Sequence, residues 1–163
     1  MPLTSYALAL GSNRRSRLGS PADAVRHAAA ALGVQRLSPV RATAAIGPAG
    51  RSFANAAALL TSELDPPEML ARLKVLEREL GRRGGRRWGP RVLDLDIILW
   101  SGGRFAGEGL SIPHPQFRLR PFVLQPLAEI AADWRDPVSG LSVRQLLHRR
   151  ARRRPVDPAS PST

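Results

Sequence analysis

The pattern of hydrophobic and polar positions predicts alternating strands and helices along most of the chain. Short apolar runs with alternation or strand-forming residues predict strands, whereas apolar residues spaced three and four apart predict helices. The predicted strands span 6–10, 34–43, 53–64 and 92–100. Helices are predicted over 22–32 and 66–80, and shorter ones over 121–132 and 142–148. The third strand is rich in alanine, which also suits a helix.

The two long helices carry recognisable start signals. Ser20 precedes Pro21 and Asp65 precedes Pro66, and both pairs are typical of an N-cap followed by the first helical residue. Gly33 is suited to end the first helix. The resulting order β-α-β-β-α-β, followed by C-terminal helices, predicts an α+β fold of the ferredoxin-like kind, an antiparallel sheet with helices on one face.

Length and composition fit one domain with anionic ligands. The chain has 163 residues, a formal net charge of +12 and no cysteine, and it shows no apolar run long enough to cross a membrane. We expect a single domain over 1–148 and a disordered tail, rich in Arg and Pro, over 149–163. With no cysteine and no evident signal peptide, the protein is expected to be cytoplasmic. It is also expected to be a monomer.

The last predicted strand carries the first candidate chemistry. Alternation places four aliphatic residues on the face toward the helices, namely Leu93, Leu95, Ile97 and Leu99. The other face carries Val92, Asp94, Asp96, Ile98 and Trp100. The two carboxylates share that face, with Cα atoms about 6.5–7 Å apart. Taken alone, such a pair is more often a solvent-facing feature, but it also suits Mg²⁺, which takes one or two carboxylates together with substrate phosphates.

The segment just before this strand favours the metal-binding interpretation of the two aspartates over the solvent-facing one. It contains glycines at 81, 84, 85 and 89 and arginines at 82, 83, 86, 87 and 91. Arginines bind phosphate oxygens in a bidentate manner, and glycines allow large backbone movements. A basic loop beside a carboxylate pair is typical of phosphoryl transfer. Trp88, inside this loop, is either a hydrophobic anchor or a cover for a flat ligand.

The segment 87–98, RWGPRVLDLDII, resembles the signature of the hydroxymethyl-dihydropterin pyrophosphokinases of folate biosynthesis. Further similarity lies in 9–13 (ALGSN), 53–57 (FANAA), 113–115 (PHP) and 120–124 (RPFVL), and it covers about residues 5–148. The resemblance implies a ferredoxin-like fold, ATP as co-substrate and two Mg²⁺ ions. It also implies transfer of pyrophosphate from ATP to 6-hydroxymethyl-7,8-dihydropterin, without nucleic acid or membrane partners.

The resemblance also implies roles for individual residues. The metal ligands would be Asp94 and Asp96, and the catalytic residues would be Arg82 and Arg91. ATP would be bound by Lys74, Glu77, Trp88, Arg91, Ile97, Ser111, His114 and Arg120. The pterin would be bound by Thr43, Ile46, Phe53, Asn55, Trp88, Asp94 and Phe122.

The proposed pterin contacts agree with the chemistry of the ligand. A pterin is flat and rimmed with donors and acceptors, so aromatic stacking on Phe53 and Phe122 and a carboxamide at Asn55 suit it. The residues alone leave an alternative open for each of two assignments. The Asn55 side chain hydrogen-bonds a neighbouring loop instead of a ligand, and His114 has a structural role instead of a ligand contact. Two other functions also remain open at this point, an RNA-binding module on the same fold and a metal-dependent nucleotide hydrolase.

Replacing Arg82 with alanine is expected to lower kcat by orders of magnitude with little effect on pterin affinity. An arginine in this basic loop is expected to act mainly on the charge that develops in the transition state. Steady-state kinetics together with equilibrium pterin titration measure the two effects separately. An equal loss in pterin binding and in turnover would contradict this role.

Overall fold

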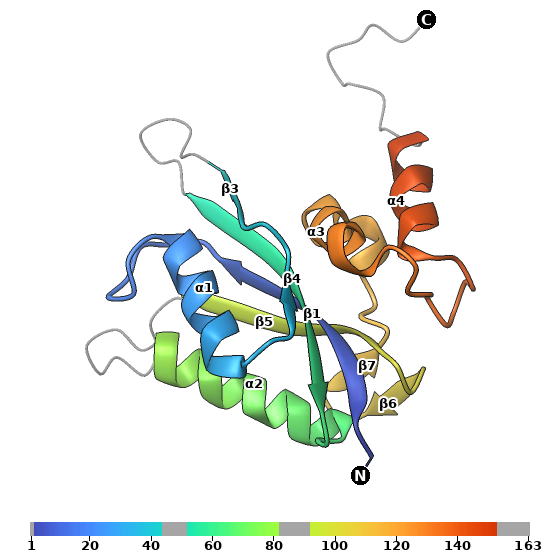
Figure 1. Ribbon diagram of the computed structural model, residues 1–163, viewed down its shortest axis with the longest axis horizontal. Helices are drawn as coiled ribbons and strands as arrows, with labels where there is room; N and C mark the ends of the chain where they lie inside the picture. Colours follow the sequence, from blue (N-terminus) through green and yellow to red (C-terminus); the bar gives the residue numbers. More distant parts are fainter. Residues whose placement is uncertain (1, 44–51, 82–91, 153–163) are drawn as a thin grey trace, which may run out of the picture.

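The computed structural model describes residues 2–43, 52–81 and 92–152. A five-stranded sheet runs through its centre (Figure 1), made of β1 (Thr4–Ser12), β2 (Arg36–Leu37), β3 (Arg41–Thr43), β4 (Phe53–Ser62) and β5 (Leu93–Trp100). The strand order is β2-β4-β1-β5, with β3 also paired to β4, and these pairings are antiparallel. The first strand therefore lies between β4 and β5, as the ferredoxin-like order requires.

Helices cover both faces of the sheet, but unequally. The helices are α1 (Pro21–Leu32), α2 (Pro66–Gly81), α3 (Pro121–Ala131) and α4 (Val143–Arg152). In Figure 1, α1 and α2 lie together, while α3 and α4 lie apart from them near the C-terminus. One hydrophobic cluster joins the sheet to α1 and α2, and a second joins the opposite face to α3 and α4. The predicted ferredoxin-like α+β fold with added C-terminal helices is confirmed.

Both long helices begin where the sequence predicts, and each start is closed by a reciprocal hydrogen-bond pair. The Ser20 hydroxyl accepts from the Asp23 backbone N–H at 3.2 Å, and the Asp23 carboxylate accepts from the Ser20 N–H at 2.9 Å. Asp65 and Glu68 exchange the same two bonds at the start of α2, at 2.9 and 3.0 Å. Gly33 ends α1 with φ of 68°, which glycine adopts without steric cost.

The second predicted strand is divided at Pro39 into β2 and β3. Proline has no N–H to donate to a sheet ladder, so it interrupts the strand at the sheet edge. Ser38, which is 2% exposed, compensates with its side chain, whose hydroxyl accepts from the Ala57 N–H at 2.9 Å. The hydroxyl thus replaces a backbone acceptor, and the edge strand resumes at Arg41.

The alanines of β4 serve close packing in a strand rather than helix formation. Every second residue, Ala54, Ala56 and Ala58, is buried in the cluster that contains Ala24 and Ala28 of α1. Small side chains on both surfaces let the helix approach the sheet closely. Burial with a period of two identifies the segment as a strand, as predicted.

A β-bulge changes the predicted facing of the end of β5. Ala7 pairs with Leu99 and Leu8 pairs with Ile97, so Ile98 is an extra residue on β5. A bulged residue interrupts the alternation of side chains between the two faces. The simple alternation predicted over 92–100 therefore holds only from Leu93 to Ile98, and Val92 belongs to the cluster beneath α1 and α2.

Two assignments beyond the bulge are corrected. Leu99 does not share a face with Leu95, because it belongs to the cluster beneath α3 and α4. Trp100 does not share the face of Asp96, because it packs against the other cluster and stacks on Tyr6 with ring centroids 6.3 Å apart. Because of the extra residue Ile98, the Leu99 and Trp100 side chains each lie on the face opposite to the one predicted.

The C-terminal region contains elements that the sequence pattern did not predict. β6 (Phe105–Gly107) and β7 (Leu110–Ile112) form a hairpin, followed by a 3-10 turn over Phe117–Leu119. Helix α4 extends to Arg152, so residues 149–152, predicted to lie in the tail, are helical. Arginine is a good helix former and is favourable near a helix C-terminus, which explains the difference. Residues 153–163 lie outside the described part.

A buried ion pair ties the 3-10 turn to the segment between α3 and α4. Asp136 is 0% exposed and accepts from two nitrogens of Arg118 at 2.5 and 2.7 Å. It also accepts from the Ser139 hydroxyl at 2.6 Å and the Val138 N–H at 3.0 Å. Burial alone would raise the pKa of Asp136, but these hydrogen bonds and the Arg118 charge outweigh it and hold the pKa well below its ordinary value.

Replacing Asp136 with asparagine is expected to destabilise the protein by about 3 kcal/mol at neutral pH, because Arg118 loses its buried counter-charge. A carboxyl whose folded-state pKa is lowered stabilises the protein above its unfolded pKa of about 4, and that contribution is lost as the pH falls further. Urea unfolding at pH 7 and pH 3 measures both effects. The difference in the free energy of unfolding between the variant and wild type should be smaller at pH 3 than at pH 7.

The matched control is Asp133→Asn, since Asp133 pairs with Arg144 in an exposed ion pair. Exposed pairs contribute little to stability. Equal destabilisation by the two variants would contradict the role given to Asp136.

Candidate active site

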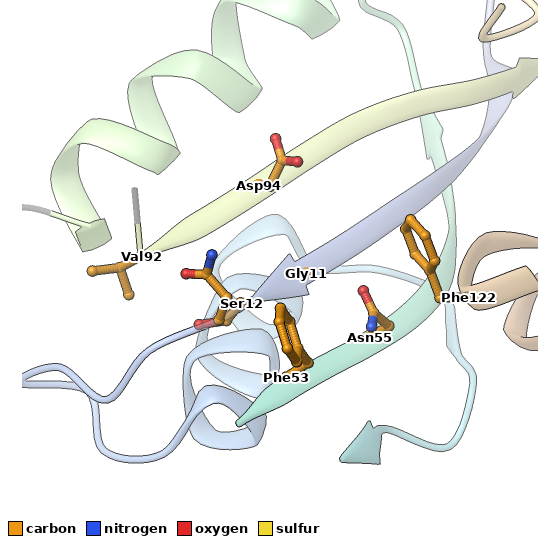
Figure 2. A pocket seen from close by; sticks show the side chains of 8 residues that line it. Gly11, Ser12, Phe53, Asn55, Val92, Asp94 and Phe122 are labelled. Atoms are coloured by element: carbon orange, nitrogen blue, oxygen red, sulfur yellow. The ribbon is translucent and has the colours of Figure 1, made fainter. Parts of the chain in front are cut away.

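A cavity of about 600 Å³ opens on the sheet face opposite α1 and α2 (Figure 2). Its described lining comes from β1, β4, β5, α3 and the residues next to these strands, namely Gly11, Ser12, Asn13, Phe53, Asn55, Val92, Asp94 and Phe122. The volume falls within the range of about 300–1,000 Å³ that is usual for small-molecule sites. Four of the residues predicted from the sequence, Phe53, Asn55, Asp94 and Phe122, line this one cavity.

Strand register brings the polar residues of the cavity together. Gly11 on β1 pairs with Asn55 on one side and with Asp94 on the other. Figure 2 shows Gly11 at the end of β1 between these two side chains. Since neighbouring strands lie about 4.8 Å apart, the Cα atoms of Asn55 and Asp94 are about 10 Å apart across β1. An amide and a carboxylate therefore border one space with bare backbone between them.

Two aromatic rings stand at the cavity. Phe53 precedes Asn55 by two residues and lies on the same side of β4, and Phe122 comes from the first turn of α3 (Figure 2). Both rings are unusually open for phenylalanine, at 45% and 51% exposed. Exposed apolar surface inside a concave site is typical of a ligand-binding region.

Asn55 makes no side-chain hydrogen bond with the parts of the chain that the structure describes. The alternative that its carboxamide satisfies a neighbouring loop therefore finds no support within 2–43, 52–81 and 92–152. A carboxamide that borders a cavity without a protein partner has both a donor and an acceptor available to a ligand.

The two aspartates of β5 differ in their environment. Asp94 is exposed, whereas Asp96 is half-buried. Burial is the main cause that raises the pKa of Asp96, and the nearby charge of Asp94 raises it further. The charge of Asp96 is therefore costly in the metal-free protein, and a cation would offset that cost.

The backbone between the two aspartates is held from its outer edge by α2. The Leu95 N–H donates to Oε1 of Glu77 at 3.1 Å. The Glu77 side chain is only 8% exposed, and the same oxygen lies 3.6 Å from Nζ of Lys74. These two residues, which the resemblance assigns to ATP binding, thus lie beside the carboxylate pair.

Two further residues assigned to ATP binding, His114 and Arg120, lie close enough to Asp96 for their charges to affect its pKa. The His114 N–H donates to the Ile98 carbonyl at 3.0 Å, which fixes the residue beside β5. Burial is the main cause that lowers the pKa of His114, so the ring is neutral at pH 7. Its Nδ1 accepts from the Gln116 N–H at 3.1 Å, so His114 also has a structural role.

Arg120 connects the regions assigned to ATP and to pterin. Its guanidinium donates to Oε1 of Gln116 at 2.8 Å and lies 5.9 Å from the ring centroid of Phe122. A cation at this distance from an aromatic face is attracted to it. The start of α3 thus holds the Arg120 charge and the Phe122 ring next to each other.

Other residues named from the sequence lie farther from the cavity or beyond the described chain. The Ile97 side chain is buried in the core at 3% exposed, so only its backbone is available to a ligand. Ser111 is exposed on β7, and Thr43 pairs with Phe53 in the β3–β4 ladder. Ile46, Arg82, Trp88 and Arg91 lie outside the described residues.

Sequence reasoning did not assign four of the lining residues, which are Gly11, Ser12, Asn13 and Val92. The available signal was a glycine followed by two polar residues at the end of the first strand. Ser12 Oγ and Asn13 Oδ1 are buried and have no hydrogen-bond partner among the residues that the structure describes. Polar atoms in this state are uncommon in folded proteins and mark the turn after β1 as part of the site.

The fold and the cavity together define a ferredoxin-like protein with a small-molecule site. Across the described residues, no group of three or more His, Asp or Glu side chains is placed to hold a metal ion. The carboxylate pair instead suits a cation that takes its remaining ligands from water and substrate phosphates, as in phosphoryl transfer.

Comparison with known proteins agrees with this class. Residues 7–132 match the family described as 7,8-dihydro-6-hydroxymethylpterin-pyrophosphokinase (HPPK). The chain is 40% identical over 149 residues to a 2-amino-4-hydroxy-6-hydroxymethyldihydropteridine pyrophosphokinase of Methylorubrum extorquens, covering 89% of this chain and 92% of that protein. It is 44% identical over 118 residues to the protein of the same name from Synechocystis, covering 72% of this chain and 60% of the relative.

The chain therefore belongs to the 6-hydroxymethyl-dihydropterin pyrophosphokinase family, which confirms the resemblance seen in the sequence. A crystal structure of Plasmodium falciparum HPPK-DHPS superposes with a TM-score of 0.72 at 14% identity, covering 93% of this chain and 42% of that one. At this identity the superposition shows the shared fold. Within the described residues, no helix has both the length and the apolar character needed to cross a membrane.

Replacing Asp96 with asparagine is expected to raise the thermal midpoint by a few degrees at neutral pH in metal-free buffer. A carboxyl whose pKa is raised by folding stabilises the protein only when protonated, and that contribution is lost as the pH rises through its folded pKa. Below pH about 4 the side chain is uncharged in both proteins, so the difference should vanish.

Calorimetry across this pH range with EDTA present measures the effect. The control is Glu108→Gln, which removes an exposed acid in the β6–β7 turn. A midpoint for the Asp96 variant that is equal to or below that of wild type at neutral pH would contradict the stated cost of the Asp96 charge.

Proposed function

We propose that this chain carries out its family's reaction in the cavity described above, transferring pyrophosphate from ATP to the 6-hydroxymethyl group of 6-hydroxymethyl-7,8-dihydropterin. The observation that carries the proposal is the pairing of β1 with both β4 and β5. This pairing places an amide suited to a pterin and a carboxylate suited to a metal across one strand from each other.

The pterin would lie in the cavity beside the aromatic rings. Phe53 and Phe122 offer apolar faces for stacking, and their exposure leaves those faces available. Asn55 offers its carboxamide to the donor and acceptor atoms on the edge of the ring. Thr43 and Ile46 would add backbone contacts, as the resemblance implies.

Asp94 and Asp96 would hold the two Mg²⁺ ions that the resemblance implies. Their carboxylates supply hard oxygen ligands. Burial is the first cause that raises the pKa of Asp96, and the charge of Asp94 raises it further, so a cation would offset the repulsion between the two carboxylates. Bound Mg²⁺ would neutralise the phosphate charge and orient the phosphates for in-line attack. The edge contact from Glu77 to the Leu95 N–H keeps the intervening backbone in place.

The nucleotide would lie on the side of Asp96 where Lys74, His114 and Arg120 are found. Lys74 and Arg120 supply positive charge, and neutral His114 supplies a hydrogen bond to a phosphate or to metal-bound water. Ile97 would contribute through its backbone, and Ser111, Trp88 and Arg91 would complete the nucleotide contacts as the resemblance implies.

The reaction exchanges one bond to phosphorus for another. The hydroxymethyl oxygen of the pterin forms a bond to the β-phosphorus of ATP, and the bond from that phosphorus to the oxygen bridging to the α-phosphate breaks. AMP leaves with that oxygen, and the hydroxyl proton is released. Arg82 and Arg91 would stabilise the charge on the transferring group, as the resemblance implies.

A coupled assay of AMP release tests the proposal. AMP should appear only when ATP, Mg²⁺ and 6-hydroxymethyl-7,8-dihydropterin are all present. Replacing Asp94 or Asp96 with alanine should lower the rate by at least about a thousandfold while circular dichroism stays unchanged, since metal and phosphate positioning supplies most of the catalysis.

Release of AMP or phosphate without the pterin would instead identify a nucleotide hydrolase. Wild-type turnover in either aspartate variant would contradict the metal assignment. Tight, salt-sensitive RNA binding together with weak ATP binding would favour the RNA-binding alternative.

A further inference from the structure

Gly11 occupies the central position of the cavity wall, yet neither the resemblance nor the comparisons assign it a role. It faces Asn55 on β4 and Asp94 on β5 in the same row of the sheet, and it lines the cavity (Figure 2). Its neighbour two residues earlier on the same face is Ala9, so β1 shows the cavity very small side chains.

The backbone at Gly11 does not itself require glycine. In the described part of the chain, five other glycines have positive φ, which residues with a side chain rarely adopt: Gly19, Gly33, Gly103, Gly109 and Gly140. Gly11 is absent from this group and lies in the regular ladder of β1. Glycine in a strand interior costs stability relative to a residue with a side chain, so its presence here calls for a different reason.

The space around Gly11 supplies that reason. A Cβ atom on Gly11 would lie 3.1 Å from Oδ1 of Asn55, closer than ordinary van der Waals contact. The next atoms, the carbonyl oxygens of Ala54 and Asp94, would lie at 3.8 and 4.0 Å, which are ordinary contact distances. Among the described residues, the Asn55 carboxamide oxygen is thus the one neighbour of Gly11 that an added Cβ atom would crowd.

We propose that Gly11 determines pterin binding by leaving the space in which the Asn55 carboxamide is seated toward the ligand. This inference rests on the proposed function, because it takes Asn55 as the residue that reads the pterin edge. A methyl group at position 11 would push the carboxamide aside. Asn55 has no hydrogen-bond partner in the described chain to resist the shift, so the fold adapts and the ligand contact is lost. Gly11 is therefore a positioning residue that acts through Asn55.

A double-mutant cycle tests the proposal. The proteins are wild type, Gly11→Ala, Asn55→Ala and the double variant. The measured quantities are the Kd of 6-hydroxymethyl-7,8-dihydropterin in the presence of a non-hydrolysable ATP analogue and the Kd of that analogue alone. Gly11→Ala should raise the pterin Kd about ten- to a hundredfold, the loss expected when buried polar contacts to a ligand are broken.

The cycle separates this role from a general effect of the methyl group. The double variant should bind pterin no more weakly than Asn55→Ala alone, because the methyl group acts only by displacing the carboxamide. The affinity for the ATP analogue should stay within about twofold in every variant. An unchanged pterin Kd in Gly11→Ala, or losses that add in the double variant, would overturn the proposal.

Two further outcomes keep the test decisive. If Gly11→Ala fails to fold, the double variant should fold, since shortening Asn55 removes the crowded atom, and a double variant that is also unfolded would overturn the proposal. If wild type binds ATP but no pterin, the proposed function itself fails and this inference fails with it. That result is distinct from wild-type pterin binding that Gly11→Ala leaves unchanged.

Discussion

The antiparallel register of β1 is the constraint on which the rest of the site depends. As the central strand, β1 fixes β4 on one side and β5 on the other through a continuous ladder of backbone hydrogen bonds. Because the period of a strand is two, a shift of one residue would move Asn55 or Asp94 to the opposite face. The tightly packed apolar face beneath α1 and α2 resists such a shift. The hydrophobic core therefore sets the distance between Asn55, which is suited to a pterin, and Asp94, which is suited to a metal-bound nucleotide.

The structure separates stability from chemistry across the two faces of the sheet. The face toward α1 and α2 is aliphatic and closely packed. The other face is only partly covered by α3 and α4. Its open part carries the two carboxylates, the Asn55 amide and the Phe53 ring, and Phe122 borders it from α3. The raised pKa of Asp96 shows that this arrangement has an energetic cost in the absence of ligand. Such a cost is typical of sites arranged for binding rather than for stability.

The C-terminal region completes the site from outside the main sheet. The 3-10 turn that contains Arg118 lies between His114 and Phe122, so its buried ion pair with Asp136 restrains both ends of a segment that borders the two ligand regions. The first turn of α3 then presents Arg120 beside Phe122. An ion pair remote from the chemistry thus contributes to the geometry of groups that would contact the substrates.

Local sequence determined most of the helices and strands and most of the candidate groups. The starts of α1 and α2 follow from capping residues next to proline, and the break at Pro39 follows from its missing N–H. The spacing of Asp94 and Asp96 identified a shared face because strand alternation is a local property. The signature around these aspartates also identified the family, and the aromatic and amide residues that it implied lie in one cavity.

Only the tertiary structure decided the features that depend on pairing between distant segments. The bulge at Ile98 arises from the register of β5 against β1, so simple alternation misassigned Leu99 and Trp100. The partner of Asp136 and the close approach of the Asn55 side chain to Gly11 likewise involve residues far apart in sequence. The sequence by itself therefore determined which chemical groups are present and on which elements they lie. Long-range strand pairing and packing decided which of those groups meet, because distances between segments are set by the whole core and not by local preference.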